Sequence, residues 1–328
     1  MNVIELREAR HARARGAMIA ARRFLLPLTI VAALASVPTP ANAQAFTLPR
    51  GVGSLTFALQ YYDDTGRRFS DGSRKSAGPT ETVTVFLEVD YGVTDRLSAT
   101  LGLPYVFARW QGGPPPPFLP YVSADICHCW HSTFQDISLT ARYRIGDDPW
   151  AVTPLVRLVE PSHDYPYKGE AVVGFDRREV AVGLNASLRL AGLLPRASLQ
   201  AGYTYSFVEQ FLGIPNDRSN GSVEIGYAVT RRLYLRTTGI WQRTHGGLRI
   251  GSPSGDPFDL PGDINTPERL QEFHRLFRNN YWQVGGGLSY SVGPFDVFAS
   301  FTKYVWGTDT HDGQAYTVGA TWYFGGAK

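Results

Sequence analysis

The chain of 328 residues has little of several features that common protein classes require. Only two residues are cysteine, only two are methionine, and 19% are charged. Outside the first 43 residues no stretch approaches the roughly 18 consecutive apolar residues of a spanning helix, which excludes a helical membrane protein. Neither cysteine lies near the N-terminal apolar segment, so we do not expect an acylated lipoprotein.

The charge balance offers no basis for nucleic-acid binding. The formal net charge is +3, but residues 1–43 contain six arginines and two glutamates, which leaves 26 basic and 27 acidic side chains in the remainder. The basic surplus therefore belongs to the N-terminal segment alone. We predict no nucleic-acid partner, because no basic surface remains to attract one.

Residues 1–43 are predicted to form a secretory signal peptide. Arg22 and Arg23 precede an apolar run over 24–37, and Ala41-Asn42-Ala43 provides an A-x-A cleavage site. Pro27 interrupts the run, which is too short to span a bilayer. Met18 is a better start for such a signal than Met1. The mature domain is therefore predicted to cover residues 44–328.

What the chain does contain is aromatic residues (13%), 34 glycines and a two-residue alternation of apolar and polar side chains. One set of alternate residues is continuously apolar in most of the alternating segments, as in Val83, Val85 and Leu87. This pattern predicts strands with one apolar face. Twelve strands are predicted, at 53–62, 81–93, 96–109, 134–145, 150–160, 176–190, 196–209, 219–230, 232–243, 279–292, 294–306 and 314–324.

The predicted connections favour a membrane barrel over a soluble sandwich. Long and short connections alternate along the chain, and every odd connection is expected to be longer than its even neighbours, down to the last one at 307–313. The connections of outer-membrane barrels alternate in this way, with short periplasmic turns and longer extracellular loops. We therefore predict an all-β fold, a transmembrane antiparallel up-and-down β-barrel of about 12 strands, in the outer membrane of the Gram-negative cell envelope.

Charged side chains of both signs alternate with the apolar residues of these strands. In a closed barrel they would face the lumen, where they must pair or line a wet channel because an unpaired buried charge is costly. We predict that a set of such residues lines the pore and sets its selectivity. The set comprises Arg142, Arg157, Arg189, Arg236, Glu88, Asp136, Glu179 and Glu224.

Two outer connections carry further candidates. The motif "DICHCWH" contains Cys127, His128 and Cys129, but its C-x-C-x-H spacing is not a closed zinc pattern. We therefore predict a Cys127–Cys129 disulfide or two free thiols, and no metal. In the connection 244–278, Thr266 and Pro267 predict the start of a short helix, which would either pack on the rim or act as a plug over the pore.

The stretch "DRSNGS", 217–222, resembles part of the His-x-Ser-Asn-Gly-like motif of outer-membrane phospholipases and lipid A deacylases. Asp217 stands where that motif has its histidine, and a carboxylate is a poor base for the hydroxyl of Ser219. The same residues suit a turn without any chemistry. Two alternatives to a channel therefore stay open: a lipid hydrolase that uses Ser219, and a plugged structural or adhesion barrel.

The stretch "GVTDRLSATLGLPYV", 92–106, describes a strand, a turn and a second strand. Together with the signal peptide and the twelve segments, it resembles the outer-membrane transporter family of the MetA pathway of phenol degradation. The resemblance implies a non-enzymatic, porin-like barrel without a cofactor, which passes small aromatic or hydrophobic compounds by passive uptake. The expected partners are outer-membrane lipids and lipopolysaccharide, the barrel-assembly machinery and the small-molecule solute.

Overall fold

The computed structural model describes residues 45–76, 79–113, 123–190, 192, 194–249, 263 and 266–325. The predicted signal peptide lies outside these residues and stays a prediction. Among the helices in the described ranges, none is long and apolar enough to span a bilayer.

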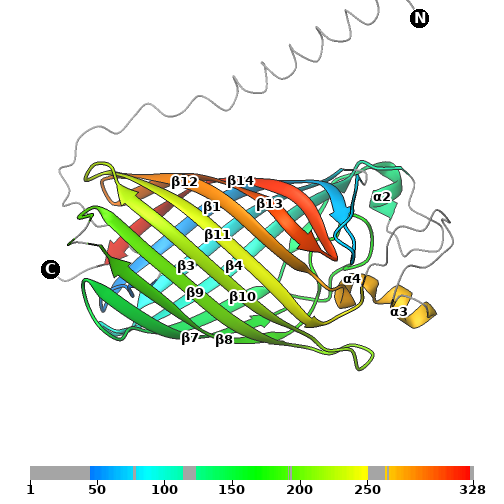
Figure 1. Ribbon diagram of the computed structural model, residues 1–328, viewed down its shortest axis with the longest axis horizontal. Coiled ribbons are helices and arrows are strands. Elements are labelled where there is room, and N and C mark those ends of the chain that lie inside the picture. The colour runs from blue at the N-terminus through cyan, green and yellow to red at the C-terminus, as the bar shows by residue number, and fades with distance from the viewer. Residues whose placement is uncertain are drawn as a thin grey trace, which may run out of the picture. The chain divides into compact units, whose positions relative to one another are not determined.

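Twelve long strands close into a barrel, which confirms the predicted fold and strand number (Figure 1). Each strand pairs antiparallel with the one before it, and the last pairs back onto the first through Val52 and Gly325. The short strands β2 (Arg74–Lys75) and β5 (His131–Phe134) pair with β1 and β4. The long strands are β1 Val52–Arg68, β3 Thr80–Gly92, β4 Leu97–Trp110, β6 Ile137–Tyr143, β7 Trp150–Glu160, β8 Glu179–Arg189, β9 Ala197–Val208, β10 Asn216–Ala228, β11 Leu233–Gly246, β12 Asn280–Val292, β13 Phe295–Thr308 and β14 Thr310–Gly325.

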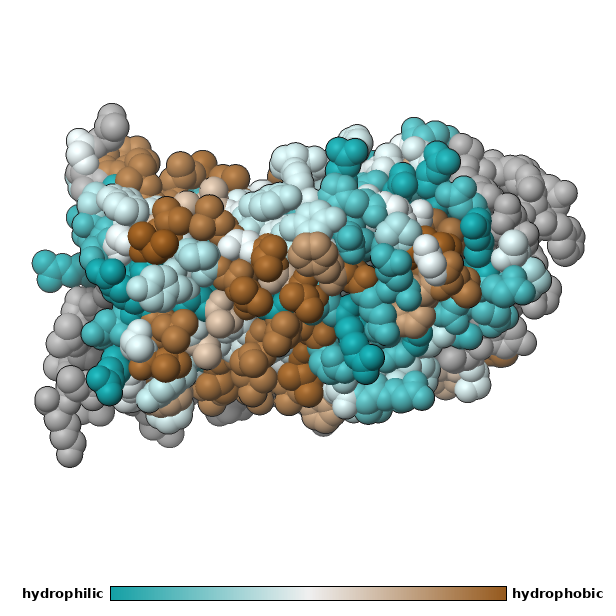
Figure 2. Space-filling model, turned by 90° about the horizontal axis from the view of Figure 1, so that it is seen from below, coloured by the Kyte–Doolittle hydropathy of each residue, from teal (hydrophilic) through white to brown (hydrophobic). Residues whose placement is uncertain are grey.

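The barrel is apolar outside and polar inside. In β9, Leu199, Tyr203 and Phe207 are exposed on the outer wall, whereas Ser206 on the inner face is buried. Figure 2 shows the apolar side chains as a band over the strands, with hydrophilic residues gathered toward the end that carries the helices. A wall of this kind suits a lipid environment rather than water, and it places the protein in the bacterial outer membrane.

The connections separate the two ends of the barrel. Short turns lie at the inner, periplasmic end, at 93–96, 144–149, 190–196, 229–232 and 293–294. The connections at the outer end are 69–79, 111–136, 161–178, 209–215 and 247–279. Four of them are longer than every inner turn, but 209–215 has seven residues like the turn 190–196, so the predicted difference in length does not hold there. The outer connections carry the helices α2 (Ser123–Cys127), α3 (Pro267–Gln271) and α4 (Phe273–Leu276).

The predicted last connection, 307–313, is wrong. Only Asp309, with a φ of 52°, separates β13 from β14. The two strands stop pairing with each other at Lys303 and Gln314. Beyond that point β13 continues along β12, and β14 continues along β1 up to Arg68. The predicted first strand, 53–62, is too short, because β1 stays paired with β14 as far as Arg68.

Candidate channel and its closures

The outer mouth of the barrel contains a hydrophobic cluster formed by loop helices. Leu270, Phe273 and Leu276 from α3 and α4 pack with Phe69 and Leu248. The helix α3 begins as predicted, since the Thr266 hydroxyl accepts a hydrogen bond from the backbone N–H of Arg269 at 3.3 Å. Residues 266–279 are termed the plug below.

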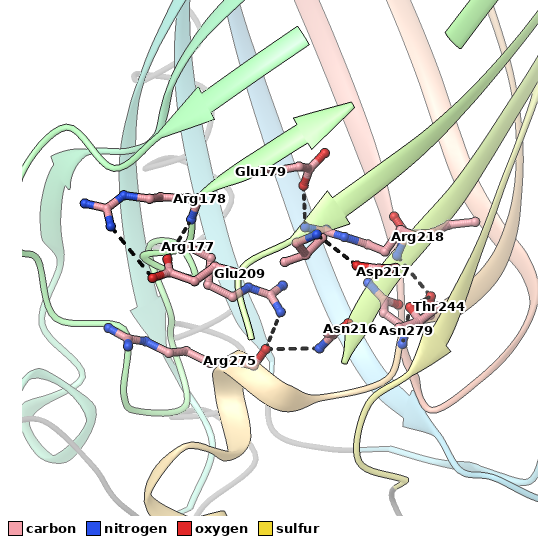
Figure 3. A network of polar contacts seen from close by, with 12 residues as sticks. Arg177, Arg178, Glu179, Glu209, Asn216, Asp217, Arg218, Thr244, Arg275 and Asn279 are labelled. Carbon is pink, nitrogen blue, oxygen red and sulfur yellow. Dashed lines mark hydrogen bonds and ion pairs between the residues drawn. The ribbon is translucent and has the colours of Figure 1, made fainter. Parts of the chain in front are cut away.

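One backbone carbonyl group of the plug accepts hydrogen bonds from two buried side chains. The carbonyl oxygen of Arg275 accepts hydrogen bonds from Arg177 Nη1 at 2.5 Å and from Asn216 Nδ2 at 3.2 Å (Figure 3). Asn216 and Arg177 are 1% and 5% exposed. Buried donors of this kind need their acceptor, because an unsatisfied buried polar group costs about 1–3 kcal/mol.

The side chain of Arg275 anchors the plug from its other side. Its guanidinium pairs with Asp176, and it stacks on the rings of Tyr167 and Phe211 with Cζ at 3.4 and 4.3 Å from their centroids. Burial raises the pKa of the Asp176 carboxyl, although Arg275 acts in the opposite direction. Burial also lowers the pKa of Arg177 to about 9, so its guanidinium stays charged at neutral pH.

The connection 161–178 joins the plug to the barrel wall. Tyr167 donates to both carboxylate oxygens of Glu272 at 3.0 Å. Glu170 pairs with Arg67 of β1 at 3.1 Å, and its backbone N–H donates to Asp125 of α2 at 3.0 Å. Burial, and then the hydrogen bond to Glu272, raise the pKa of Tyr167 to about 12. Three outer connections therefore interlock across the mouth.

A cavity of about 180 Å³ remains between the plug and the inner wall. Its apolar side includes Phe273, Phe277 and Phe175, and its polar side includes the hydroxyls of Thr82 and Thr84. An apolar cavity of about 150 Å³ holds a benzene molecule. The cavity therefore has room for a compound with a single ring.

The charged groups that line the cavity are paired. Arg67 pairs with Glu170, and Asp64 pairs with His311. Burial, followed by the nearby charge of Arg67, lowers the pKa of His274 to about 3, so this ring is neutral at physiological pH. The cavity thus presents hydrogen-bonding groups without an uncompensated charge.

A second segment contacts the inner face of the barrel at its inner end. Ala45 and Leu48, which precede β1, are 0% and 4% exposed. The carbonyl oxygen of Ala45 accepts a hydrogen bond at 2.6 Å from the hydroxyl of Thr153, which is fully buried in β7. The backbone N–H of Arg50 donates to Asp95 in the first inner turn at 3.1 Å. Residues 45–49 are termed the inner segment below.

Four of the predicted pore-lining residues form separate ion pairs or hydrogen bonds in the lumen. Arg142 pairs with Asp90 at 2.6 Å. The other three residues form two further ion pairs. Glu179 pairs with Arg218 at 2.6 Å, and Glu224 pairs with Arg236 at 3.9 Å. These three pairs join β3 to β6, β8 to β10 and β10 to β11.

Among the remaining predicted residues, Glu88 lies within range of the charges of Arg142 and Arg157. Asp136 accepts a hydrogen bond from Tyr165, and Arg189 pairs with Asp148 at the inner rim at 3.3 Å. Arg157 and Glu88 are exposed toward the lumen and form no ion pair within the described ranges. The residues at the two closures are others, namely Asn216, Arg177, Arg275, Ala45 and Thr153.

Only the plug helix had a sequence signal. Thr266 and Pro267 predict its start, but no pattern marks Asn216 or Arg177 as its partners.

Cys127 and Cys129 are joined by a disulfide in the second outer connection. His128 Nδ1 lies 3.0 Å from the carbonyl oxygen of Trp110. Across the part of the chain that the structure describes, no group of three or more His, Cys, Asp or Glu side chains could hold a metal ion.

Ser219 lies in strand β10 rather than in a turn, so the interpretation of "DRSNGS" as a turn is wrong. Its hydroxyl is 2.7 Å from His245 Nε2 of β11 and 3.0 Å from the Tyr203 hydroxyl. Ser219 is only 4% exposed. The described residues place no carboxylate on the other ring nitrogen of His245, so the pair lacks the group that orients a catalytic base.

Comparison with solved structures supports the fold. The barrel is similar to the COG4313 outer membrane channel from Pseudomonas putida F1, with a TM-score of 0.63 and 12% identity over 87% of this chain and 100% of that chain. The protein is an outer-membrane β-barrel. The NanC porin, with a TM-score of 0.47 and 10% identity, covers 82% of this chain and 98% of its own. The KdgM porin, with a TM-score of 0.43 and 8% identity, covers 83% and 99%.

At these identities the similarity is one of fold. No protein-family model matches the chain, and no curated protein matches it. The resemblance to the phenol-degradation transporter family is therefore not confirmed by a match.

Proposed function

We propose that the protein is a porin-like channel through which small, uncharged aromatic or hydrophobic compounds cross the outer membrane by passive diffusion. The observation that carries this proposal is the amphipathic cavity of about 180 Å³ between the plug and the inner wall. A solute would enter at the plug, rest in the cavity, and continue along the polar lumen past the inner segment.

The paired charges favour an uncharged solute. Arg67 and His311 already have carboxylate partners, so an anion would find no free cation, and its desolvation would remain uncompensated. Three phenylalanine rings line the cavity, and aromatic rings attract one another in edge-to-face and offset arrangements. A single ring with one hydroxyl group fits both surfaces.

Passage requires the plug to move. The plug is attached to Asn216 and Arg177 through hydrogen bonds to the carbonyl oxygen of Arg275. The Arg275–Asp176 ion pair and the hydrogen bonds from Tyr167 to Glu272 also hold it. All of these are noncovalent contacts, which can break and re-form without an energy source, and this is consistent with passive diffusion.

The test measures the concentrations at which two compounds, each with one benzene ring, block the ion current through the channel in planar bilayers. Uncharged benzyl alcohol is expected to block at concentrations about tenfold lower than benzoate, because the carboxylate is not compensated in the cavity. Val172→Phe, which fills the cavity, should remove the block. Val180→Phe is the matched control, since Val180 is exposed on the outer wall. Equal block by benzoate would contradict the proposed selectivity.

The plugged structural barrel is the competing function. The interlocked outer connections are the observation that favours it. A complete absence of current, even in variants that release the plug, would establish it in place of the channel.

A further inference from the structure

A groove of about 400 Å³ lies on the outer wall of strands β11, β12 and β13. Trp241 packs edge-on against Trp282, with ring centroids 6.4 Å apart. The groove is lined by Trp241, Gln242, Arg243, Asn280, Trp282 and Trp306.

The groove arises because the strands part at this level. Cα register pairing of β11 with β12 ends at Gln242 and Tyr281. Toward the outer end, hydrogen bonds that involve side chains replace the backbone hydrogen bonds between the two strands. The backbone N–H of Thr244 donates to Asn280 Oδ1 at 2.8 Å, and Gln242 Nε2 donates to the carbonyl oxygen of Asn279 at 3.0 Å. The floor of the groove is therefore polar, while its sides are indole rings.

The groove lies at the outer edge of the apolar band. Lys303 on β13 is paired in register with Gln314, which is paired with Asp63, and Asp63 with Glu81. This row of polar residues continues around the barrel from the strands of the groove. Toward the membrane interior, exposed apolar residues such as Val297 and Val318 follow on the same strands. Tryptophan is the residue that prefers this head-group level.

One cation lines the groove, and a second lies on the same outer wall. Arg243 is exposed at its outer lip, and no acidic residue is among the six that line it. Lys303 is exposed on the same wall, and a lysine stem can run along apolar surface while its ammonium group reaches the polar region. The acid on the neighbouring strand, Asp217, already accepts from Tyr205 and from the backbone N–H of Val208.

We propose that this groove binds a phosphate-bearing lipid of the outer leaflet. An acyl chain would lie between the indole rings, and the phosphate would contact Arg243 and Lys303. Arginine binds phosphate through two parallel N–H donors, and the negative headgroup complements a wall that is locally basic. The site lies on the lipid-facing side of the wall, so it is distinct from the cavity under the plug.

The test is binding of bisphosphorylated lipid A to the full-length barrel in detergent, measured by native mass spectrometry. Arg243→Gln and Lys303→Gln are each expected to weaken binding about tenfold, since each removes a charge-assisted contact. Arg243→Lys should retain most of the affinity. Arg231→Gln is the matched control, because Arg231 is an exposed arginine in an inner turn at the opposite end.

Two further ligands distinguish binding of the whole lipid from binding of its acyl part or its phosphate alone. Dephosphorylated lipid A and inorganic phosphate should each bind more weakly than the intact lipid. Wild-type affinity in both Gln variants would overturn the proposal, as would equal binding of the dephosphorylated lipid. Equal binding of inorganic phosphate would overturn the lipid assignment. A folded barrel in every variant is verified by its heat-modifiable electrophoretic mobility.

Discussion

The side-chain amide of Asn216 lies 3.2 Å from the carbonyl oxygen of Arg275. A buried residue at the outer end of strand β10 therefore holds the plug from the barrel wall. The same amide lies 3.4 Å from the carbonyl oxygen of Phe277. One side chain thus satisfies the end of a short helix whose last carbonyl groups have no partner within the helix.

Asn216→Ala is expected to loosen the plug. Because the substitution leaves the carbonyl of Arg275 with one donor fewer, amide hydrogen exchange over residues 266–279 should accelerate about tenfold. Arg178→Ala is the control, since Arg178 is an exposed arginine beside Arg177 (Figure 3) whose side chain pairs with Glu160 and Glu209. Unchanged exchange in Asn216→Ala would show that this contact does not hold the plug.

The channel is expected to open more often at acid pH. The pKa of His274 is lowered to about 3 in the folded plug, chiefly by burial and then by Arg67, His311 and Lys168. The displaced plug binds a proton more readily, so the stability of plug packing is complete above about pH 6.5 and falls as the pH drops toward 3. Ion current should therefore rise between pH 7 and pH 4.

His274→Phe should flatten this pH profile, because phenylalanine fills the same hydrophobic site without titrating. His163→Asn is the control, since His163 is exposed and bonds to Thr133. A profile that stays steep in His274→Phe would assign the pH response to another group, such as the His311–Asp64 pair.

Arg142→Met is expected to destabilise the barrel. The substitution leaves Asp90 in the lumen without its cation, and both side chains of the pair are 16% exposed. The free energy of unfolding in urea should fall by about 1–3 kcal/mol. Arg96→Met, in an exposed pair with Asp147 at 3.9 Å, should cost less than about 1 kcal/mol. Equal losses in the two variants would show that the lumen screens the Arg142 pair like bulk water.

Ser219→Ala is expected to leave ester hydrolysis and solute flux unchanged. The hydroxyl of Ser219 is covered, and its neighbour His245 has no carboxylate partner in the described part of the chain. Hydrolysis of phospholipid vesicles by the purified protein is the measurement, with Ser222→Ala on the inner face as the control. A hydrolytic activity that disappears only in Ser219→Ala would establish the lipid hydrolase instead.

Deleting residues 45–48 is expected to raise the conductance of the open channel. The inner segment occupies the lumen beside Thr153, so its removal should widen the inner end. The deletion is best measured in the Asn216→Ala background, where the plug no longer limits the current. Thr153→Val keeps the segment and removes one hydrogen bond, so it should have a smaller effect. An unchanged conductance after the deletion would place the narrowest point elsewhere.

The barrel could be predicted because its determinants are local. Alternate residues such as Leu199, Tyr203 and Phe207 face lipid along one strand, and a two-residue period is visible without any knowledge of the partner strand. The short inner turns follow from the same pattern. The helix start at Thr266 and Pro267 was visible for a similar reason, since capping depends on neighbouring residues.

The closures could not be predicted because their contacts are distant in sequence. Asn216 and Arg177 lie 59 and 98 residues from Arg275, and no period relates them. Arg142 and Arg236 pair with carboxylates on nearby strands, and the selectivity role of the predicted pore-lining set stays a prediction. The connection at Asp309 forms because β13 continues along β12 and β14 continues along β1 after the two strands stop pairing with each other. The alternation within one strand does not reveal where pairing between two strands ends.

Single-channel recording in planar bilayers tests the central proposal most directly. Wild-type protein, Asn216→Ala and Arg178→Ala should be compared at neutral pH under one voltage. We predict brief openings in the wild type, a fraction of time open about tenfold higher in Asn216→Ala, and wild-type behaviour in Arg178→Ala. The absence of current in all three proteins, or an equal open fraction in Asn216→Ala and the wild type, would contradict a channel gated by this plug.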